Sequence, residues 1–418
     1  MRNSGMNMPR VKQENRSSIL RCILEQGATS RKDIARLTGL TPAAVTQLCA
    51  ELLAEGLLAE CGSQLQSAKT QGVDPQGTVT LTAEAQGVET QNFEAQGTGN
   101  QSAGTGKRGA GRKKILLDIN AAGRHLLVIS LGVETTFLAV SDLKGECLCR
   151  TSLPTDRGIP PVEFLARVAE AAHAMLQSAK TPLPRLCGVS VTVPGAVDKE
   201  RGLSLQAYGL WDGQVEVCRL LGDALGLPVC IENNVNAFAV AELLYGAGRR
   251  YDNLLLVKWG PGVGSAIITD GRLYEGRHGK AAELGHFIVE RGGSLCRCGR
   301  RGCLETKVSW QALCREMPFL PERFGEAYRQ AAAVGGADAF DAAIDLFART
   351  IVNSMTILAP NRVVLFGPMF RDARIRRKLT DACCAYDARY DAQRILYSAL
   401  AEKEEAIGPA AVFAQSVF

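Results

Sequence analysis

Four side chains near the middle of the chain have the types and spacing of a metal site. Three cysteines follow a C-x-C-x₄-C pattern, and a histidine lies upstream of them beyond a short loop. Thiolate and imidazole groups are the ligands of closed, tetrahedral zinc sites, and two glycines let the cysteine loop turn tightly. The alternative is a set of buried, inert thiols. The pattern favours a structural Zn²⁺ ion held by His286, Cys296, Cys298 and Cys303.

Two carboxylates flank this cluster. Glu283 precedes the histidine and Glu305 follows the last cysteine. A metal-pinned loop would hold Glu283, His286 and Glu305 rigidly around one small polar ligand. Paired acceptors of this kind suit the hydroxyls of a sugar, whereas the alternative is a solvated loop with ordinary surface charges.

With its upstream turn, the segment resembles the ROK family of repressors, uncharacterised frames and sugar kinases. The family pattern joins a glycine-rich strand turn to Glu-x-Gly-His and Cys-x-Cys-Gly-x-x-Gly-Cys-x-Glu, which fall at 260–266, 283–286 and 296–305. The resemblance runs from about residue 124 to the C-terminus. It implies an α/β, two-lobed actin-like fold and a sugar-type ligand.

The resemblance also places Gly195 and Asn233 against the sugar. The family's kinases carry an aspartate at the position of Asn234, where it takes the proton from the hydroxyl that attacks ATP. An amide has no usable basicity near neutral pH, so Asn234 can hydrogen-bond a hydroxyl but cannot act as the base.

The nucleotide side departs from the family pattern as well. Ser130 replaces an aspartate in the first phosphate loop, and Glu134 adds a negative charge there. Pro261 removes an N–H from the second loop, and Pro368 replaces one of two paired glycines. These changes predict a domain without kinase activity. The alternative is a cytoplasmic, ATP-dependent kinase for a hexose or N-acetylhexosamine.

The elements that carry these residues are expected as alternating strands and helices. Strands are predicted at 126–130, 137–141 and 186–193, with helices at 162–178 and 237–246. Trp211, in the loop after the Gly195 turn, is either an aromatic neighbour of the ligand or a core anchor.

The first sixty residues predict a winged helix-turn-helix. A helix is expected over 17–26, a second opens at Ser30, and a third follows Thr41 and Pro42 over 43–55. This segment also resembles the winged helix-turn-helix of ROK-family repressors, which the family's kinases lack. The alternative is a helical module for protein binding or dimerisation.

The predicted DNA contacts fall into two groups. Side chains on the recognition helix are expected near base edges, and basic side chains near phosphates. The first group is Thr41, Ala43, Ala44, Thr46 and Gln47, and the second is Arg31, Lys32, Arg36, Arg112 and Lys113.

Composition predicts how the chain divides. The boundaries are expected at 1–62 for the DNA-binding domain, 63–111 for a disordered Gln/Gly-rich insertion in the wing, 112–123 for the returning strand and linker, and 124–418 for the ROK-like domain. The net charge of +5 is mild, so any nucleic-acid binding must be local. No apolar run reaches the roughly 20 residues of a membrane span, and the cysteine pattern indicates a reducing cytoplasm.

These observations predict a cytoplasmic transcriptional regulator, a repressor, that binds a double-stranded DNA operator and a sugar or sugar-derivative effector. Two DNA-binding heads would read two half-sites, which implies a homodimer or a tetramer. A metal sensor is the remaining alternative, but a closed four-ligand site is typical of a permanent structural ion.

Overall fold

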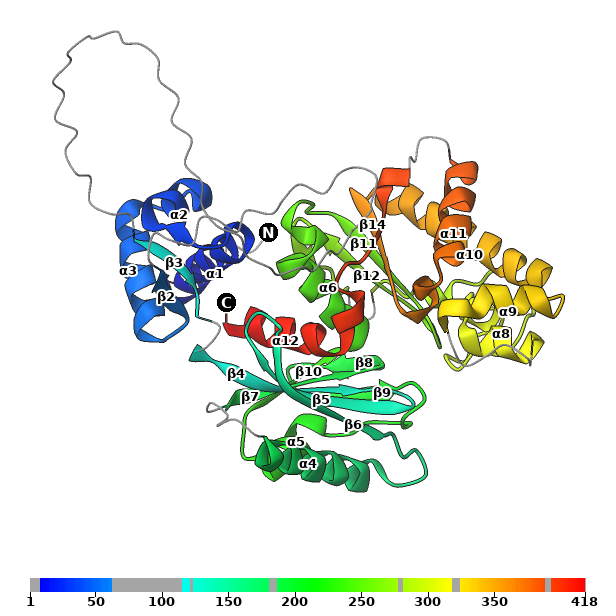
Figure 1. The fold of residues 1–418 in the computed structure, drawn as a ribbon, viewed down its shortest axis with the longest axis horizontal. Coiled ribbons are helices and arrows are strands. Elements are labelled where there is room, and N and C mark those ends of the chain that lie inside the picture. The colour runs from blue at the N-terminus through cyan, green and yellow to red at the C-terminus, as the bar shows by residue number, and fades with distance from the viewer. Residues whose placement is uncertain are drawn as a thin grey trace, which may run out of the picture.

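The computed structural model describes residues 8–61, 115–120, 123–179, 186–276, 281–317, 324–387 and 392–417. Figure 1 shows a small N-terminal domain beside two larger lobes. The predicted insertion at 63–111 and the predicted contacts Arg112 and Lys113 lie outside the described residues.

The N-terminal domain packs three helices against a small antiparallel sheet with the strand order β1-β3-β2. Ser30 caps the second helix by accepting a hydrogen bond from the Asp33 N–H, and Gly39 ends it in the left-handed conformation. Thr41 caps the third helix through the Ala44 N–H. The first helix begins well before the predicted residue 17. The elements are α1 Met8–Gln26, β1 Thr29–Ser30, α2 Arg31–Thr38, α3 Pro42–Ala54, β2 Leu58–Cys61 and β3 Leu116–Ile119.

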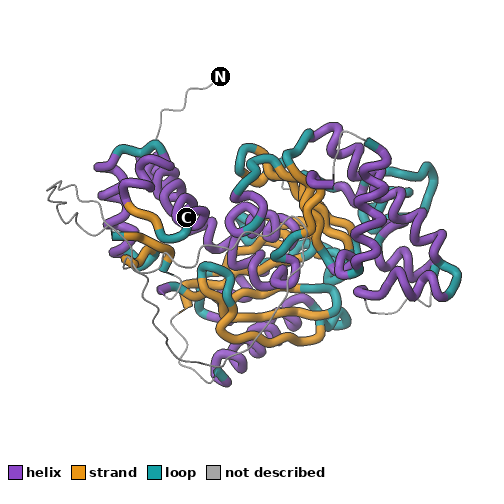
Figure 2. The backbone as a smooth tube through the Cα atoms, turned by 45° about the horizontal axis from the view of Figure 1, so that its top comes forward, coloured by secondary structure: helices purple, strands orange, loops and turns teal. Residues whose placement is uncertain are grey.

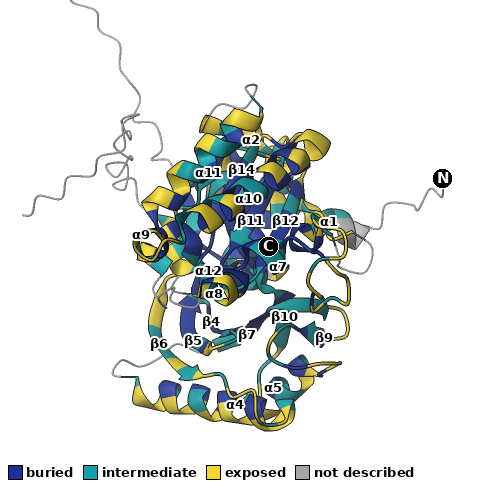
Figure 3. Ribbon diagram, turned by 90° about the vertical axis from the view of Figure 1, so that its right-hand side faces the viewer, coloured by how far each residue is buried: buried dark blue, intermediate teal, exposed yellow. Residues whose placement is uncertain are grey.

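Lobe I is built on a five-stranded sheet with the order β10-β7-β4-β5-β6. Strands β4, β7 and β10 are parallel, whereas β4, β5 and β6 form an antiparallel meander. Figure 3 shows α4 yellow on its outward face and dark blue where it meets the sheet. The elements are β4 His125–Leu131, β5 Thr135–Asp142, β6 Cys147–Pro154, α4 Pro161–Ser178, β7 Leu186–Val193, β8 Gly195–Asp198, β9 Leu203–Ala207, α5 Val217–Leu225 and β10 Val229–Asn233.

Lobe II repeats this topology with the order β13-β12-β11-β14-β15, again a meander followed by parallel strands. A duplicated sheet of this kind is the predicted two-lobed actin-like architecture. The strands are β11 Leu254–Trp259, β12 Val263–Thr269, β13 Arg272–Leu273, β14 Arg362–Phe366 and β15 Ile395–Tyr397. The principal helices are α6 Asn234–Tyr245, α7 Glu305–Val308, α8 Trp310–Glu316, α9 Ala327–Ala333, α10 Ala337–Leu358, α11 Ala373–Tyr386 and α12 Glu404–Val417.

Helices α6 and α12 pack against each other between the two sheets (Figures 1 and 2). Helix α12 covers the inner face of the lobe I sheet, and α6 packs on β12 of lobe II. The Phe238 ring of α6 stacks on Phe366 of β14, with 4.1 Å between ring centroids. This helix pair therefore joins the lobes at the base of the cleft between them.

The N-terminal domain is continuous with lobe II through apolar packing. Helix α1 packs against α6, and buried side chains such as Ile19 and Ile23 belong to the same hydrophobic cluster as Phe238 and Leu243. On the lobe I side, Lys144 forms an ion pair with Asp118 of β3 at 3.1 Å. The N-terminal domain, whose residues 8–61 and 115–120 are called the head below, is thus held against both lobes.

No single helix among the described residues is long and apolar enough to span a membrane. The pair α2 and α3 passes the length and composition criteria only together, with a bend of 118° between them.

Candidate functional site

A cavity of about 490 Å³ lies between the lobes. Six predicted ligand-contacting residues line it, although they come from distant parts of the chain. They are Gly195, Asn233, Asn234, Glu283, His286 and Glu305. The structure therefore brings together every residue that the sequence assigned to the sugar.

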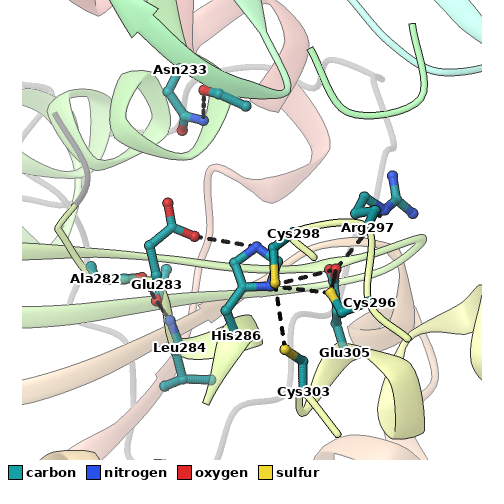
Figure 4. A network of polar contacts seen from close by, with 12 residues as sticks. Asn233, Ala282, Glu283, Leu284, His286, Cys296, Arg297, Cys298, Cys303 and Glu305 are labelled. Atoms are coloured by element: carbon teal, nitrogen blue, oxygen red, sulfur yellow. Dashed lines mark hydrogen bonds and ion pairs between the residues drawn. The ribbon is translucent and has the colours of Figure 1, made fainter. Parts of the chain in front are cut away.

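The four predicted metal ligands lie close together, and one of them, His286, also lines the cavity (Figure 4). Their ligand atoms all lie within 4.8 Å of one another. Cys298 Sγ is 3.6 Å from Cys303 Sγ, and Cys296 Sγ is 3.5 Å from His286 Nδ1. Zn–S bonds of about 2.3 Å give tetrahedral S···S edges of roughly 3.8 Å. The cluster therefore has the size and the donors needed to hold a metal ion.

Gly302 explains how the cysteine loop closes on itself. Its φ is +74°, and a Cβ there would lie 1.7 Å from the Glu290 carbonyl oxygen. The Gly302 N–H donates to the Ser294 carbonyl, and its own carbonyl accepts from the Val289 N–H. Any larger residue would force the loop open and separate the thiols.

His286 faces both the metal cluster and the cavity. Its Nδ1 points to the thiols, while Nε2 lies 3.5 Å from Glu283 Oε2. Glu305 is also close to the cluster, because the Cys296 thiol donates to Glu305 Oε1 at 3.1 Å. Burial raises the pKa of Cys296, and the Glu305 carboxylate raises it further. A metal ion would have to displace the thiol proton and so break this hydrogen bond.

Asn233 ties the opposite wall together. Its Oδ1 accepts from the Val235 and Asn236 N–H groups, and its Nδ2 donates to the Gly195 carbonyl at 2.7 Å. The helix therefore begins at Asn234 and not at the predicted residue 237, because the Asn233 side chain caps it. Only one amide hydrogen of Asn233 remains for a ligand.

Asn234 is different from its neighbour. Among the described residues, its side-chain amide has no hydrogen-bond partner, although it lines the cavity. Its donor and acceptor are therefore available to a hydroxyl.

Gly195 is required by the backbone packing of the site. Its φ is +117°, and a Cβ there would meet the Gln206 carbonyl oxygen at 2.3 Å. The close approach that requires glycine is thus made by strand β9.

Buried Glu232 supports this wall from behind. It is 2% exposed, accepts from the Asn233 N–H at 2.8 Å and pairs with Lys199 at 2.7 Å. Lys199 also reaches Glu275 of lobe II at 2.5 Å. A charge network therefore links the Asn233 turn to the other lobe.

Lining residues that the sequence reasoning missed include Tyr208, Arg297 and Gln311. Arg297 Nη2 donates to Gln311 Oε1 at 2.8 Å, and its guanidinium lies 6.0 Å from the Tyr208 ring centroid. Burial, and after it the negative charge of Glu283, raises the pKa of Tyr208, so the phenol stays protonated. Arg297 could have been found from its place between two cysteine ligands. Trp211 is a core anchor, 9% exposed, whose indole N–H donates to Ser204 Oγ.

Comparison with known proteins gives the chain its family. A model of the ROK family matches residues 126–416, and a model of winged helix-turn-helix DNA-binding domains matches residues 12–59. The chain belongs to the ROK family.

Relatives of this ROK protein include both regulators and kinases. It is 27% identical over 303 residues to a xylose repressor from Caldicellulosiruptor bescii, covering 72% of this chain and 65% of that repressor. It thus spans about two thirds of that relative's length. It is 30% identical over 284 residues to a glucokinase from Thermotoga maritima, covering 61% of this chain and 87% of the kinase.

One solved structure matches nearly the whole chain. It is the crystal structure of a ROK family transcriptional regulator, a homolog of the E. coli Mlc protein, with a TM-score of 0.72 at 24% identity and 97% coverage of both chains. This similarity confirms the predicted fold, with the DNA-binding head and the ROK domain in one chain.

The ROK cavity is also lined by the residues that depart from the kinase pattern. Ser130, Glu134, Pro261 and Pro368 all line it. The Ser130 hydroxyl already has a partner within the protein, because it donates to the Glu405 carbonyl at 2.6 Å.

The head presents most of its predicted DNA contacts to solvent. Exposed or half-exposed positions on or beside the recognition helix α3 are Thr41, Ala43, Ala44, Thr46 and Gln47. Lys32 is exposed, and Arg36 is 70% exposed beside Asp33. Arg31 is partly engaged, because it pairs with Glu60 of the wing at 3.2 Å.

Proposed function

We propose that this protein is a DNA-binding transcriptional repressor that senses a sugar in the cavity between its lobes. One observation carries the proposal: a winged helix-turn-helix is packed directly onto a ROK domain whose cavity is lined by hydroxyl-binding side chains. The name of the xylose repressor among its relatives supports the same conclusion.

The cluster of one histidine and three cysteines is proposed to bind a structural Zn²⁺ ion. The donor set and the spacing of the ligand atoms support zinc over harder cations. When bound, the ion supplies a rigid link between the loop that carries Glu283 and the one that carries Glu305. The protein's own contribution is to orient His286, so that Nε2 faces the ligand.

Kinase activity is proposed to be lost. Asn234 occupies the position of the general base, and an amide cannot accept the hydroxyl proton. It can accept a hydrogen bond from the hydroxyl, so ligand binding does not need the missing aspartate.

Helix α6 provides the route from ligand to DNA. Its first turn is built on Asn233 and Asn234, and its apolar face packs against α1 of the head. Ligand contact at the start of α6 would favour one arrangement of the lobes and hence one placement of the head. In a homodimer or tetramer, this would change the distance between paired heads and their fit to two half-sites.

The test begins with selection of bound fragments from genomic DNA, followed by gel-shift titration with a panel of sugars. We expect Glu283→Ala and Glu305→Ala to abolish the sugar response and to leave the affinity for DNA unchanged. Glu290→Ala is the matched control, because Glu290 lies on the same loop and pairs with Lys307 instead of lining the cavity. An unchanged response in both cavity variants would place the ligand elsewhere.

The kinase alternative is tested separately. A coupled ATPase assay with hexoses and N-acetylhexosamines should show no sugar-dependent turnover. Turnover at roughly 1–100 s⁻¹, the usual range for kinases, would reject the proposal.

A further inference from the structure

The first turn of α12 forms part of the cavity wall. Glu404 and Glu405 line the cavity, together with Ala401 and Glu402 just before them. Glu404 forms an ion pair with Lys258 of β11, and both side chains are mostly buried, at 17% and 20% exposure. This pair therefore lies in the cavity wall and is largely shielded from solvent.

The same turn is fastened to both lobes. Lys258 holds it to lobe II through Glu404, and Ser130 holds it to lobe I by donating to the Glu405 carbonyl. Thr192 of β7 lies 2.8 Å from the Ser130 hydroxyl and completes this contact. Lys403 adds a second link to lobe I, at 2.9 Å from Glu146. A ligand group that displaced this turn would have to break contacts on both sides.

The charges lining the cavity are unfavourable for an anion. Among the described residues, six glutamates line the cavity against three lysine or arginine side chains. Each cation already has a carboxylate within ion-pair distance: Lys258 has Glu404, Arg297 has Glu305 and Arg371 has Glu402. By contrast, Glu134 and Glu405 have no cationic partner in an ion pair within the described chain, and burial raises the pKa of Glu405.

The helix N-termini that face the cavity do not offset this excess of negative charge. A helix N-terminus attracts anions through its free N–H groups and dipole. At α6, the Asn233 side chain takes up the first N–H groups. At α12, Glu404 and Glu405 place two carboxylates in the first turn.

We infer that the effector of this protein is an unphosphorylated sugar, because the carboxylates that line the cavity outnumber its cations and each cation is already paired, so that a phosphate on the ligand would meet uncompensated negative charge. This inference rests on the proposed sugar-sensing function and specifies its ligand class. The same negative charge disfavours the phosphates of a nucleotide.

The test compares free and phosphorylated forms of the same sugars on the full-length protein by isothermal titration calorimetry. The probes are glucose, N-acetylglucosamine and xylose, the 6-phosphates of the two hexoses, xylose 5-phosphate, and ADP with Mg²⁺. We expect at least one free sugar to bind, its phosphate to bind at least about thirtyfold more weakly, and Mg-ADP not to bind.

Two variants test the residues responsible. Glu405→Gln and the double variant Glu404→Gln/Glu405→Gln should narrow the gap between free and phosphorylated sugar, by about tenfold or more in the double variant. Glu405→Gln leaves the ion pair between Lys258 and Glu404 intact, so it can be interpreted even if the double variant folds poorly. Retained affinity for the free sugar shows that the cavity is folded. Glu146→Gln is the matched control, because it removes a carboxylate that holds the same turn from outside the cavity.

The outcomes separate the inference from the function on which it rests. Equal or tighter binding of a phosphorylated sugar would overturn the inference and leave sugar sensing intact. If the ratio of the affinities for the free and the phosphorylated sugar is unchanged in both variants, the carboxylates of α12 do not discriminate against the phosphate. If no sugar binds in either form, the sensing function itself fails, and the inference fails with it.

Discussion

Asn233 gives a sharp test of how the cavity wall is built, because one side chain holds two elements. Asn233→Ala removes the cap of α6, which costs about 1 kcal/mol of the free energy of unfolding. It also removes the hydrogen bond to the Gly195 carbonyl, worth about another 1 kcal/mol. The total of about 2 kcal/mol corresponds to a fall of roughly 4–8 °C in the unfolding midpoint of a lobe-sized unit.

Asn233→Ser separates the two contributions. A serine retains the capping oxygen but is too short to reach Gly195, so about half of the loss should remain. Differential scanning calorimetry measures the midpoints, and hydrogen exchange of the peptide over 232–240 reports the α6 amides directly. In Asn233→Ala these amides should exchange faster than in the wild type, and in Asn233→Ser they should stay protected. Equal exchange in the two variants, or a midpoint for Asn233→Ala within about 1 °C of the wild type, would refute the reasoning.

Three further predictions follow from the structure. Cys303→Ser should release the bound metal, measured by inductively coupled plasma mass spectrometry, whereas Cys314→Ser, outside the cluster, should retain it. Gly302→Ala should also abolish metal binding, because its Cβ would collide with a carbonyl oxygen, whereas Gly299→Ala meets no atom within 4 Å and should retain metal with a loss of about 1 kcal/mol from its positive φ. Burial raises the pKa of Glu242 above its usual 4.5, so its contribution to stability is fully present below 4.5 and is lost as the pH rises through the higher folded value. Unfolding midpoints measured across that range should therefore fall more steeply with pH in the wild type than in Glu242→Gln; parallel curves would contradict the assignment.

Local signals were enough to locate the helix-turn-helix. Ser30 and the Thr41-Pro42 pair are caps whose partners lie within three residues, so the start of each helix can be read from a short window of sequence. The strand at 186–193 was likewise predicted with its observed bounds, because a buried parallel strand is a continuous apolar run. The ligand cluster could be predicted for the same reason: its spacing is short and chemically specific.

What the sequence did not provide was contact between distant segments. Helix α6 begins three residues before the prediction, since apolar periodicity starts later than the Asn233 cap. Tyr208 and Gln311 have no motif and reach the cavity only through the fold. The position of α12 in the cavity wall was also unforeseen, because Lys258 and Glu404 are separated by 146 residues.

The shared hydrophobic cluster of α1 and α6 has a consequence for engineering new regulators. A head cut from this protein at the wing would carry away Ile19 and Ile23 and leave the apolar side of α6 in water. Chimeras that join a DNA-binding domain from another protein to this ROK domain will therefore need a first helix that covers α6. Chimeras without such a helix should aggregate. The apolar contact between α1 and α6, more than the linker, determines which DNA-binding domains can be exchanged.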